Sequence, residues 1–496
     1  MNEYRLPDDY VNVAWKWFRD TFGIVTECRT IERENRKCTI KIEFGDRCYS
    51  VVFPSDFEIN LKDFVNDVIW NIRFYIDGNR LVIDQDIFAL IYLTISGNLE
   101  RNLDRSLFLR LVGKPYLDII SNRMFDMIKK MIGNNDILIT KPFLTDNSFA
   151  VCLTHDVDEI KKTYQYITRS LRSLRNRDLE GVLKELRSFI RKMKGKEPYW
   201  TFEKLIELEK SMGVRSTLYF LKETGKVKIT DPSTWRHLGR RYEFDDVADV
   251  IKFLHSRGWE VGLHGSFYSY RDRSLLKREK LELERILGKR VIGIRQHNLN
   301  LDIPQTWRIQ ESLGFEYDTT LGSNHYVGFR WGTCYPFYPY DEERQRFLRV
   351  LQIPLHIEDI AVFREDDPWR ICVQTLWEVK RMGGVLTLLW HHAVFDEDEY
   401  PGWAKLYRDL IEFCKRENAL VTKAEDIARI WRNRLNSNVS VEYEGKFVSV
   451  RVEGCIPLRI YSPSKLIVND SDVTIRRGNG YLDVYCKKSE FKIKSV

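Results

Sequence analysis

Short apolar runs alternate with longer amphipathic segments between residues 150 and 433, and this alternation constrains the fold more than any other feature of the chain. The runs that have the length and composition of strands are Phe149–Thr154, Ser216–Phe220, Glu260–Leu263, Val291–Ile294, Leu351–Ile353 and Val385–Trp390. The segments with helical spacing are Phe202–Met212, Phe244–Arg257, Lys277–Leu287, Pro304–Leu313, Trp369–Met382 and Trp403–Glu417. Strands that alternate with helices build parallel sheets with crossover connections. The sequence therefore predicts an α/β fold, either an open sheet or a barrel.

The two ends of the chain have a different character. Residues 1–149 combine strand-like segments such as Cys38–Phe44 with the helical segment Tyr116–Ile132, which predicts an α+β accessory domain. Residues 434–496 contain short segments of alternating apolar and polar residues separated by turns, which predicts a small antiparallel β domain. At about 150 residues per domain, the length of 496 residues agrees with three domains, at 1–149, 150–433 and 434–496.

Composition narrows the class of protein. The chain is 43% hydrophobic and 30% charged, which is typical of a globular protein and excludes a disordered or collagen-like one. Its net charge of +7 is too small for this length to indicate a nucleic-acid partner, and we expect none. The N-terminal residues lack the apolar segment of a signal peptide, and the nine scattered cysteines are typical of reduced thiols. We therefore expect a cytoplasmic protein, whose oligomeric state stays open.

Residues 161–196 stand out by their charge. They contain twelve Lys and Arg residues against three acidic ones, and their apolar residues recur at helical spacing. One interpretation is an arm that contacts an anionic polymer, a phosphate or a membrane surface. The other is a solvated helical insertion in the α/β domain.

Polar side chains follow four of the predicted strands at their carboxyl ends. Because the carboxyl ends of parallel strands meet on one rim, these side chains are expected to lie close together. In chain order they are Asp156 and Asp158, His264, Arg295 and His297, and His391.

The first of these residues suit a metal-assisted reaction. Two carboxylates on one face of a strand, such as Asp156 and Asp158, can divide the roles of base and metal ligand. A neutral imidazole such as that of His264 can bind a metal, or it can be a hydrogen-bonded structural residue.

The later clusters offer complementary groups. Arg295 can orient a carboxylate through a bidentate pair. His297 can be a metal ligand or a proton donor, and His391 can act as a general acid. The coincidence of all four clusters in one predicted domain favours a functional site over a set of unrelated structural residues.

The order of these motifs resembles that of the polysaccharide deacetylases, carbohydrate esterase family 4. Leu153–Asp158 (LTHDVD) is similar to the family's first motif, T-F-D-D-G, in a D-x-D form, and Glu260–His264 (EVGLH) is similar to the second, E-x-G-x-H. Gly293–Arg295 resembles the third motif, Gly314–Thr320 (GFEYDTT) the segment after it, and Leu388–His391 the last, L-x-x-H. The resemblance covers residues 150–430 or so.

The resemblance implies a distorted (β/α) barrel with fewer than eight strands. It implies a hydrolase that uses a divalent metal, usually zinc, to remove an N-acetyl group from a sugar or glycan. By position, Asp156 matches the catalytic base, Arg295 the arginine that fixes the base, and His391 the general acid that protonates the leaving amine.

The metal ligands depart from the family's pattern. His264 matches the first metal histidine, but the second should lie four residues later, where the chain has Tyr268. Asp158 is taken as the metal carboxylate, because the strict match, Val157, cannot bind a metal. His297 or water could complete the site. If neither does, the alternative is an inactive descendant that binds carbohydrate.

Aromatic residues near the motifs are candidates for sugar contact, because aromatic rings combine a large apolar face with, in Tyr and Trp, a polar group. The predicted substrate-binding residues are Arg330, Trp331, Tyr268, Trp390 and Trp403. The same rings could equally fill a core. In a cytoplasmic protein the N-acetylated substrate is expected to be a lipid-linked or nucleotide-linked glycan precursor.

Overall fold

The structure, a computed structural model, describes residues 3–25, 28–34, 36–44, 47–133, 136–223, 242–444, 447–453, 456–462, 466–468, 473–478, 480–486 and 490–495. The chain forms two compact units. The first comprises Met1–Asp146, Trp331–Phe347 and Arg429–Val496, and the second comprises Asn147–Arg330 and Leu348–Ala428.

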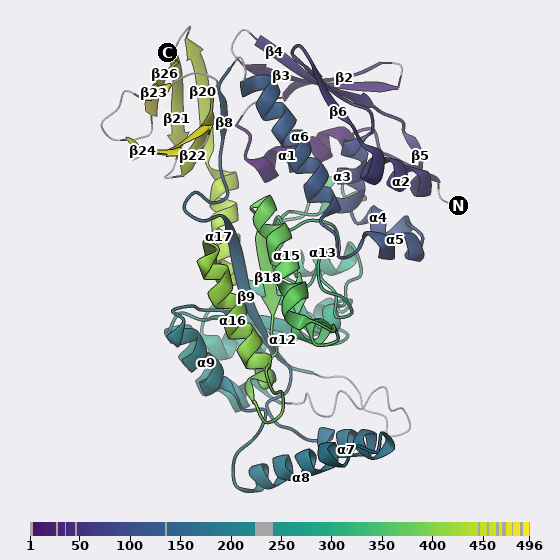
Figure 1. Ribbon diagram of the computed structural model, residues 1–496, viewed down its shortest axis with the longest axis vertical. Coiled ribbons are helices and arrows are strands. Elements are labelled where there is room, and N and C mark those ends of the chain that lie inside the picture. Colours follow the sequence, from purple (N-terminus) through teal and green to yellow (C-terminus); the bar gives the residue numbers. More distant parts are fainter. Residues whose placement is uncertain are drawn as a thin grey trace. The chain divides into compact units, whose positions relative to one another are not determined.

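The second unit is built on a parallel sheet (Figure 1). Its strands are β9 (Phe149–Val157), β10 (Thr217–Leu221), β11 (Glu260–Gly265), β12 (Gly293–Gln296), β13 (Tyr317–Asp318), β16 (Leu351–Gln352), β17 (Ile357–Glu358), β18 (Val385–Leu389) and β19 (Ala419–Thr422). Their order is β16-β13-β12-β11-β10-β9-β18-β17, with β19 also beside β9, and all these pairings are parallel. The predicted α/β class with a parallel sheet is confirmed.

The two edge strands of this order follow one another in the chain. β16 ends at Gln352 and β17 begins at Ile357. Between them, the backbone N–H of Ile353 donates to the carbonyl of Asp318, and that of His356 donates to the carbonyl of Thr387. Because a strand rises about 3.3 Å per residue, the two edges are at most about 17 Å apart along this segment. The sheet therefore curls into an incomplete barrel.

Helices connect the strands, as the alternation predicts. They are α9 (Phe202–Ser211), α11 (Ala248–Ser256), α12 (Arg273–Leu287), α13 (Gln305–Ser312), α14 (Asp359–Val362), α15 (Pro368–Met382) and α16 (Trp403–Arg416), with 3-10 turns η2 (Phe244–Val247), η3 (His297–Leu299) and η4 (His392–Phe395). α17 (Ala424–Asn436) follows the last strand, and its residues from Arg429 onward belong to the first unit. Local signals set their ends. The Asp272 side chain caps α12 by accepting from the backbone of Leu275. Asp367 caps the start of α15, whose first residue is Pro368, and Gly383, in the left-handed conformation, follows its last residue.

The basic segment forms two further helices of the second unit, α7 (Gln165–Arg175) and α8 (Leu179–Met193). In Figure 1 they extend from the rest of that unit. Among the described helices of the chain, none is long and apolar enough to cross a membrane.

The first unit contains mostly antiparallel sheets. A five-stranded sheet has the order β2-β3-β4-β7-β6, where the strands are β2 (Cys28–Glu34), β3 (Lys37–Phe44), β4 (Arg47–Pro54), β6 (Phe74–Asp77) and β7 (Arg80–Ile83). The short pairs are β1 (Glu3–Arg5) with β5 (Glu58–Asn60) and β14 (Tyr340–Asp341) with β15 (Arg346–Phe347). The helices are α1 (Tyr10–Phe22), α2 (Leu61–Asn71), α3 (Ile87–Ile95), α4 (Asn98–Asn102), α5 (Arg105–Leu111) and α6 (Tyr116–Gly133).

The C-terminal strands of the first unit form two four-stranded sheets. They are β20 (Asn438–Glu444), β21 (Phe447–Glu453), β22 (Pro457–Tyr461), β23 (Leu466–Val468), β24 (Val473–Gly478), β25 (Tyr481–Cys486) and β26 (Glu490–Ser495). The orders are β20-β21-β26-β23 and β24-β25-β22-β8, where β8 (Leu138–Thr140) comes from the N-terminal part of the chain. Ile139 packs with Val450, Leu458 and Val484 in one apolar cluster, so the two ends of the chain share a core.

Candidate functional site

Strand β9 ends in two carboxylates that face the same side. Asp156 Oδ2 lies 3.4 Å and Asp158 Oδ1 lies 3.2 Å from the Nε2 atom of His264. His155, directly before Asp156 in sequence, turns the other way, and its Nε2 atom lies 3.0 Å from Glu209. The alternation of side chains along the strand thus brings both aspartates to one site.

His264, in β11, is oriented by a hydrogen bond of its Nδ1 atom. Its Nδ1 atom lies 2.9 Å from the carbonyl oxygen of Arg295, so Nδ1 carries the hydrogen and the lone pair of Nε2 faces the carboxylates. Gly265 permits this close packing, because a Cβ there would lie 2.4 Å from a side-chain oxygen of β12. Burial alone would lower the pKa of His264, but Asp156 and Asp158 raise it above its ordinary value.

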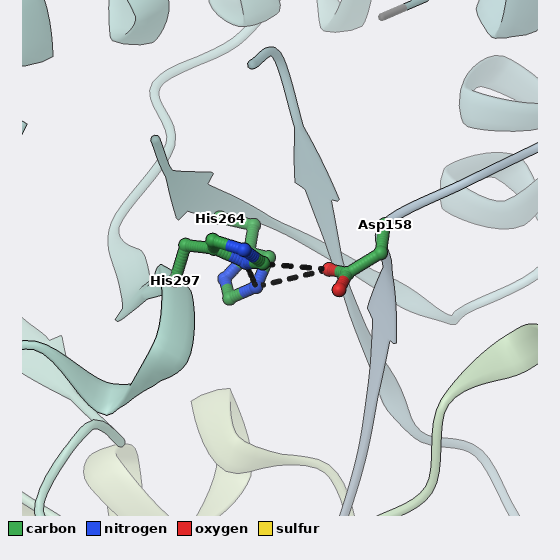
Figure 2. Close-up of side chains that lie close together, drawn as sticks. All are labelled: Asp158, His264 and His297. Carbon is green, nitrogen blue, oxygen red and sulfur yellow. Dashed lines mark hydrogen bonds and ion pairs between the residues drawn. The ribbon is translucent and has the colours of Figure 1, made fainter. Parts of the chain in front are cut away.

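His297, at the start of η3, brings a second imidazole to the same place. Its Nδ1 atom lies 3.2 Å from Nε2 of His264 and 3.7 Å from Oδ1 of Asp158. Figure 2 shows the two rings and the carboxylate converging. Tyr268, the sequence position of the family's second histidine, is 53% exposed, and its ring packs on Phe267 instead.

This donor set fits a divalent cation. Zinc binds imidazole nitrogen and carboxylate oxygen at about 2.0–2.2 Å in tetrahedral sites, which places neighbouring ligand atoms about 3.3–3.6 Å apart. The separations among Asp158, His264 and His297 are 3.2, 3.2 and 3.7 Å. Two imidazoles and one carboxylate also match the ligand chemistry of catalytic zinc sites, which keep a further position for water or substrate.

Arg295, in β12, fixes the first carboxylate. Its guanidinium is fully buried and donates to Asp156 Oδ1 at 2.9 Å and to the hydroxyl of Thr154 at 2.8 Å. The same group lies over the ring of Tyr219, 4.8 Å from its centroid. Asp156 Oδ1 is therefore held in place while Oδ2 faces the site.

His391 approaches from the end of β18. Its Nδ1 atom lies 2.8 Å from Oδ1 of Asp359, and its Nε2 atom lies 4.0 Å from Oδ2 of Asp158. Burial alone would lower the pKa of His391, but the Asp359 carboxylate, with Asp158 beyond it, raises the pKa to about 10. The imidazole is therefore a proton donor at neutral pH.

Glu358, next to Asp359, is buried, and this burial raises its pKa to about 8. Glu358, Asp359 and His391 also place potential ligand atoms within 4.8 Å of one another. Both oxygens of Asp359 already serve His391, one at its ring and one at its backbone N–H. This group is thus a hydrogen-bonded cluster beside the first one.

The residues predicted to contact sugar lie in different surroundings. Trp390 is fully buried, and Trp331, which belongs to the first unit, is 2% exposed and donates to Glu100. Trp403 is partly buried and stacks on Phe363 with centroids 3.9 Å apart. The burial of Trp331 and Trp390 does not support sugar stacking on their rings, because stacking needs an open face. Contact through Tyr268, Trp403 or the partly exposed Arg330 stays a prediction.

Sequence reasoning missed two groups that shape the site. Asp359 follows a strand of only two residues, so no apolar run marks its position. Glu209, fully buried, accepts from Tyr407, Trp259 and Ser216 and contacts His155, which anchors the back of β9. A buried glutamate within a helix gives no sequence signal beyond its helical spacing.

Comparison with known proteins gives weak likenesses only. No family model matches the sequence, and no curated protein matches it. Among solved structures, a protein from Mycobacterium smegmatis described as a polysaccharide deacetylase is 17% identical over 59% of this chain and 92% of its own, with a TM-score of 0.38. The allantoinase PuuE is 15% identical over 59% and 93%, with a TM-score of 0.40.

A third similar structure is the peptidoglycan deacetylase PdaC from Bacillus subtilis. It is 10% identical over 59% of this chain and 96% of its own, with a TM-score of 0.31. With TM-scores below 0.5, these likenesses carry no argument about function, which depends on the residues of the site.

Proposed function

We propose that this protein is a metal-dependent hydrolase that removes an N-acetyl group from a sugar or glycan. The observation that carries the proposal is the convergence of Asp158, His264 and His297 beside an Arg-held Asp156. These residues come from the ends of three strands of one parallel sheet, which is where such folds place catalytic groups. The motif order supports the same reaction class.

The proposed ligands are Asp158, His264 and His297. A divalent cation there, most simply zinc, would polarise the acetyl carbonyl and lower the pKa of water to about 7. In this proposal His297 supplies the second nitrogen ligand, because the chain has Tyr268 where the family's second metal histidine is expected.

The remaining residues handle protons. Asp156, oriented by Arg295, takes the proton of the attacking water. His391, protonated at neutral pH and oriented by Asp359, gives a proton to the nitrogen of the leaving amine. Asp156 lies 3.4 Å from His264, and His391 lies 4.0 Å from Asp158, so the proposed base and acid each lie beside a different member of the ligand group.

Metal content and acetate release test the proposal together. The full chain is loaded with zinc, desalted and analysed, as wild type, His264→Ala and His255→Ala. His255 lies on α11, outside the site, and controls for loss of a histidine. We expect one zinc per chain in wild type and His255→Ala, and loss in His264→Ala.

Activity is then measured as acetate released from N-acetylglucosamine oligomers. Asp156→Asn should keep its zinc and lose on the order of a hundredfold or more in kcat. A wild-type chain that retains no zinc would contradict the proposed metal-dependent hydrolase activity. Glycan binding by that zinc-free chain would instead support the inactive carbohydrate-binding alternative.

A further inference from the structure

Helices α7 and α8 form an antiparallel hairpin. Arg169 on α7 lies 3.9 Å from Glu185 on α8, and the ring of Tyr166 packs edge-on against Phe189 with centroids 5.5 Å apart. The two helices are joined by the short turn at Asn176–Asp178. The hairpin thus has one fixed internal arrangement.

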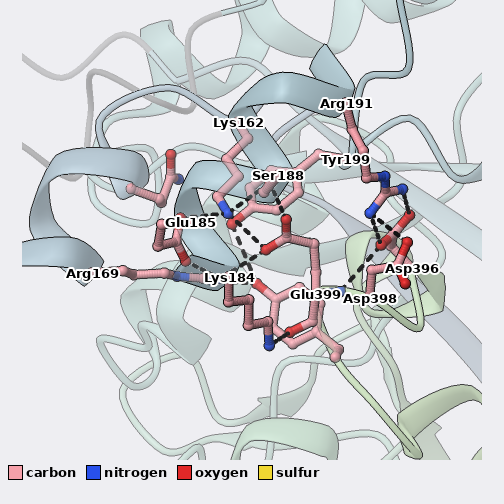
Figure 3. Close-up of polar contacts among 12 residues, drawn as sticks. Lys162, Arg169, Lys184, Glu185, Ser188, Arg191, Tyr199, Asp396, Asp398 and Glu399 are labelled. Atoms are coloured by element: carbon pink, nitrogen blue, oxygen red, sulfur yellow. Dashed lines mark hydrogen bonds and ion pairs between the residues drawn. The ribbon is translucent and has the colours of Figure 1, made fainter. Parts of the chain in front are cut away.

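One face of the hairpin is fastened to the second unit by buried charges (Figure 3). The ammonium of Lys162 is fully buried and contacts Glu185 at 2.6 Å and Glu399 at 2.7 Å. Arg191 makes a paired contact with Asp396 at 3.0 and 2.8 Å. Buried ion pairs fix the position of the hairpin, because separating the partners leaves an uncompensated buried charge.

The opposite face carries an apolar stripe that the described residues leave exposed. Of the twenty large apolar side chains that are exposed in the described chain, nine lie on these two helices. They are Ile167, Leu171, Leu174, Leu179, Leu183, Leu186, Phe189, Ile190 and Met193, with exposed fractions from 44% to 73%. The spacing of 167, 171 and 174, and of 179, 183, 186, 190 and 193, places each set along one side of its helix.

Basic side chains border this stripe. At 100° per residue, Arg187 and Lys194 fall roughly 60–80° round α8 from the stripe, and Arg175 falls at a similar angle on α7. All three are exposed. Glu185, by contrast, points to the anchoring side, where it meets Lys162. The outward surface therefore combines apolar residues with positive charge.

We propose that the α7–α8 hairpin docks on an anionic membrane surface, with the apolar stripe at the boundary of headgroups and acyl chains. An amphipathic helix with large apolar residues on one face and Lys and Arg beside them is suited to that boundary. Anionic headgroups supply the complementary charge. The inference stands independently of the proposed hydrolase activity.

Two other occupants fit these features less well. The phosphate backbone of a nucleic acid would pair with the basic residues. It would not cover the nine exposed apolar side chains. A second copy of the chain would cover the stripes, but it would bring together two surfaces on each of which the exposed charged residues of 161–196 are seven basic and two acidic. Like charges at that density oppose such a contact.

The hairpin is anchored close to the candidate site along the chain. Lys162 lies four residues after Asp158, and Glu399 lies eight residues after His391. Both anchoring residues therefore lie on chain segments that lead directly out of the candidate site. A membrane-bound hairpin would hold that rim of the barrel close to the lipid surface.

Vesicle sedimentation with the full chain tests the inference. Vesicles of phosphatidylcholine alone are compared with vesicles containing about a third phosphatidylserine, at about 0.1 M salt. The stripe variant is Leu183→Glu with Ile190→Glu. Leu281→Glu on α12 is the matched control, since Leu281 is 54% exposed and lies outside the hairpin. Arg187→Gln with Lys194→Gln removes charge and keeps the stripe.

We expect wild type and Leu281→Glu to bind the anionic vesicles alike, with at least tenfold weaker binding by the stripe variant and several-fold weaker binding by the charge variant. Equal thermal unfolding midpoints would show that the exposed substitutions leave the fold intact. Absence of wild-type binding, or binding that the stripe variant retains, would overturn the inference. A dimer in light scattering that the stripe variant dissociates, or salt-dependent RNA binding without vesicle binding, would overturn it in favour of those occupants.

Discussion

Asp359 holds His391 at two points. Its Oδ2 atom accepts from the backbone N–H of His391 at 2.7 Å, and its Oδ1 atom lies 2.8 Å from the ring Nδ1 atom. The two contacts fix the position of the ring and direct Nδ1 to Asp359, so Nε2 is presented to the site, 4.0 Å from Asp158. The same carboxylate is the main reason that the pKa of His391 rises to about 10 despite burial.

The first prediction concerns this pair. Asp359→Asn should return the pKa of His391 toward its ordinary value near 6.5, because the raising charge is gone and burial remains. A general acid works only while protonated, so the variant's activity should fall as pH rises through the lowered pKa, to about a tenth or less of wild type at pH 8. NMR titration of His391 and pH–rate profiles measure both effects. Asp366→Asn, at an exposed carboxylate seven residues later in the chain, should change neither.

A second prediction concerns the buried Arg295–Asp156 pair. Arg295→Met should lower the free energy of unfolding by about 3–5 kcal/mol, because Asp156 and Thr154 lose their buried partner. Adding Asp156→Asn should recover part of that loss, with a coupling energy of about 1 kcal/mol or more. Urea unfolding of the four proteins measures the cycle. Strict additivity would contradict the pairing.

The control for this cycle is an exposed ion pair of the same unit. Arg285 contacts Asp245 at 2.7 Å, and both side chains are more than 60% exposed. Arg285→Met should therefore change the free energy of unfolding by less than about 1 kcal/mol.

The third prediction separates His297 from Tyr268 as the second nitrogen ligand. His297→Ala should lower zinc affinity by on the order of a hundredfold or more, because the site loses one of its two imidazoles. Tyr268→His in the same chain should not restore it, since position 268 is half-exposed and its ring packs on Phe267. Competition with a zinc-binding dye measures affinity. Recovery by the histidine at 268 would show that the loop, and not η3, supplies the ligand.

Short apolar runs made most of the parallel sheet predictable. β9, β10, β11 and β18 fall within two or three residues of their predicted bounds, because a buried parallel strand is apolar on both faces. β13 and β17 have two residues each, too few to show any periodicity. The closing of the sheet between β16 and β17 depends on hydrogen bonds between distant segments, which no local pattern encodes.

The residues of the candidate site that follow strand ends could be predicted from the sequence. Asp156, Asp158, His264 and His297 meet because parallel strands end on one rim, so the convergence follows from topology once the strands are known. Burial of aromatic side chains was not predictable in the same way. Trp390 and Trp403 both follow β18, yet one is fully buried and the other only partly, which depends on tertiary packing.

The last prediction concerns acid stability of the hairpin anchor. Burial opposes ionisation of Asp396, but the hydrogen bonds of Arg191 and Lys204 outweigh it and lower its pKa from 3.8 to about 2. A carboxyl with a lowered pKa stabilises the folded state above about pH 4, and this stabilisation is lost as pH falls from 4 toward 2. Asp396→Asn should therefore speed amide exchange of α8 on the order of tenfold at neutral pH and leave little difference near pH 2.

Asp398→Asn is the matched control, since Asp398 contacts the same Arg191 at 2.7 Å but is 74% exposed. A solvent-exposed partner contributes little, so exchange in α8 should stay close to wild type in that variant. If both variants speed exchange equally, the anchor depends on net charge around Arg191 and not on the buried pair. If only Asp396→Asn does so, and the gap closes in acid, the buried carboxylate holds the hairpin.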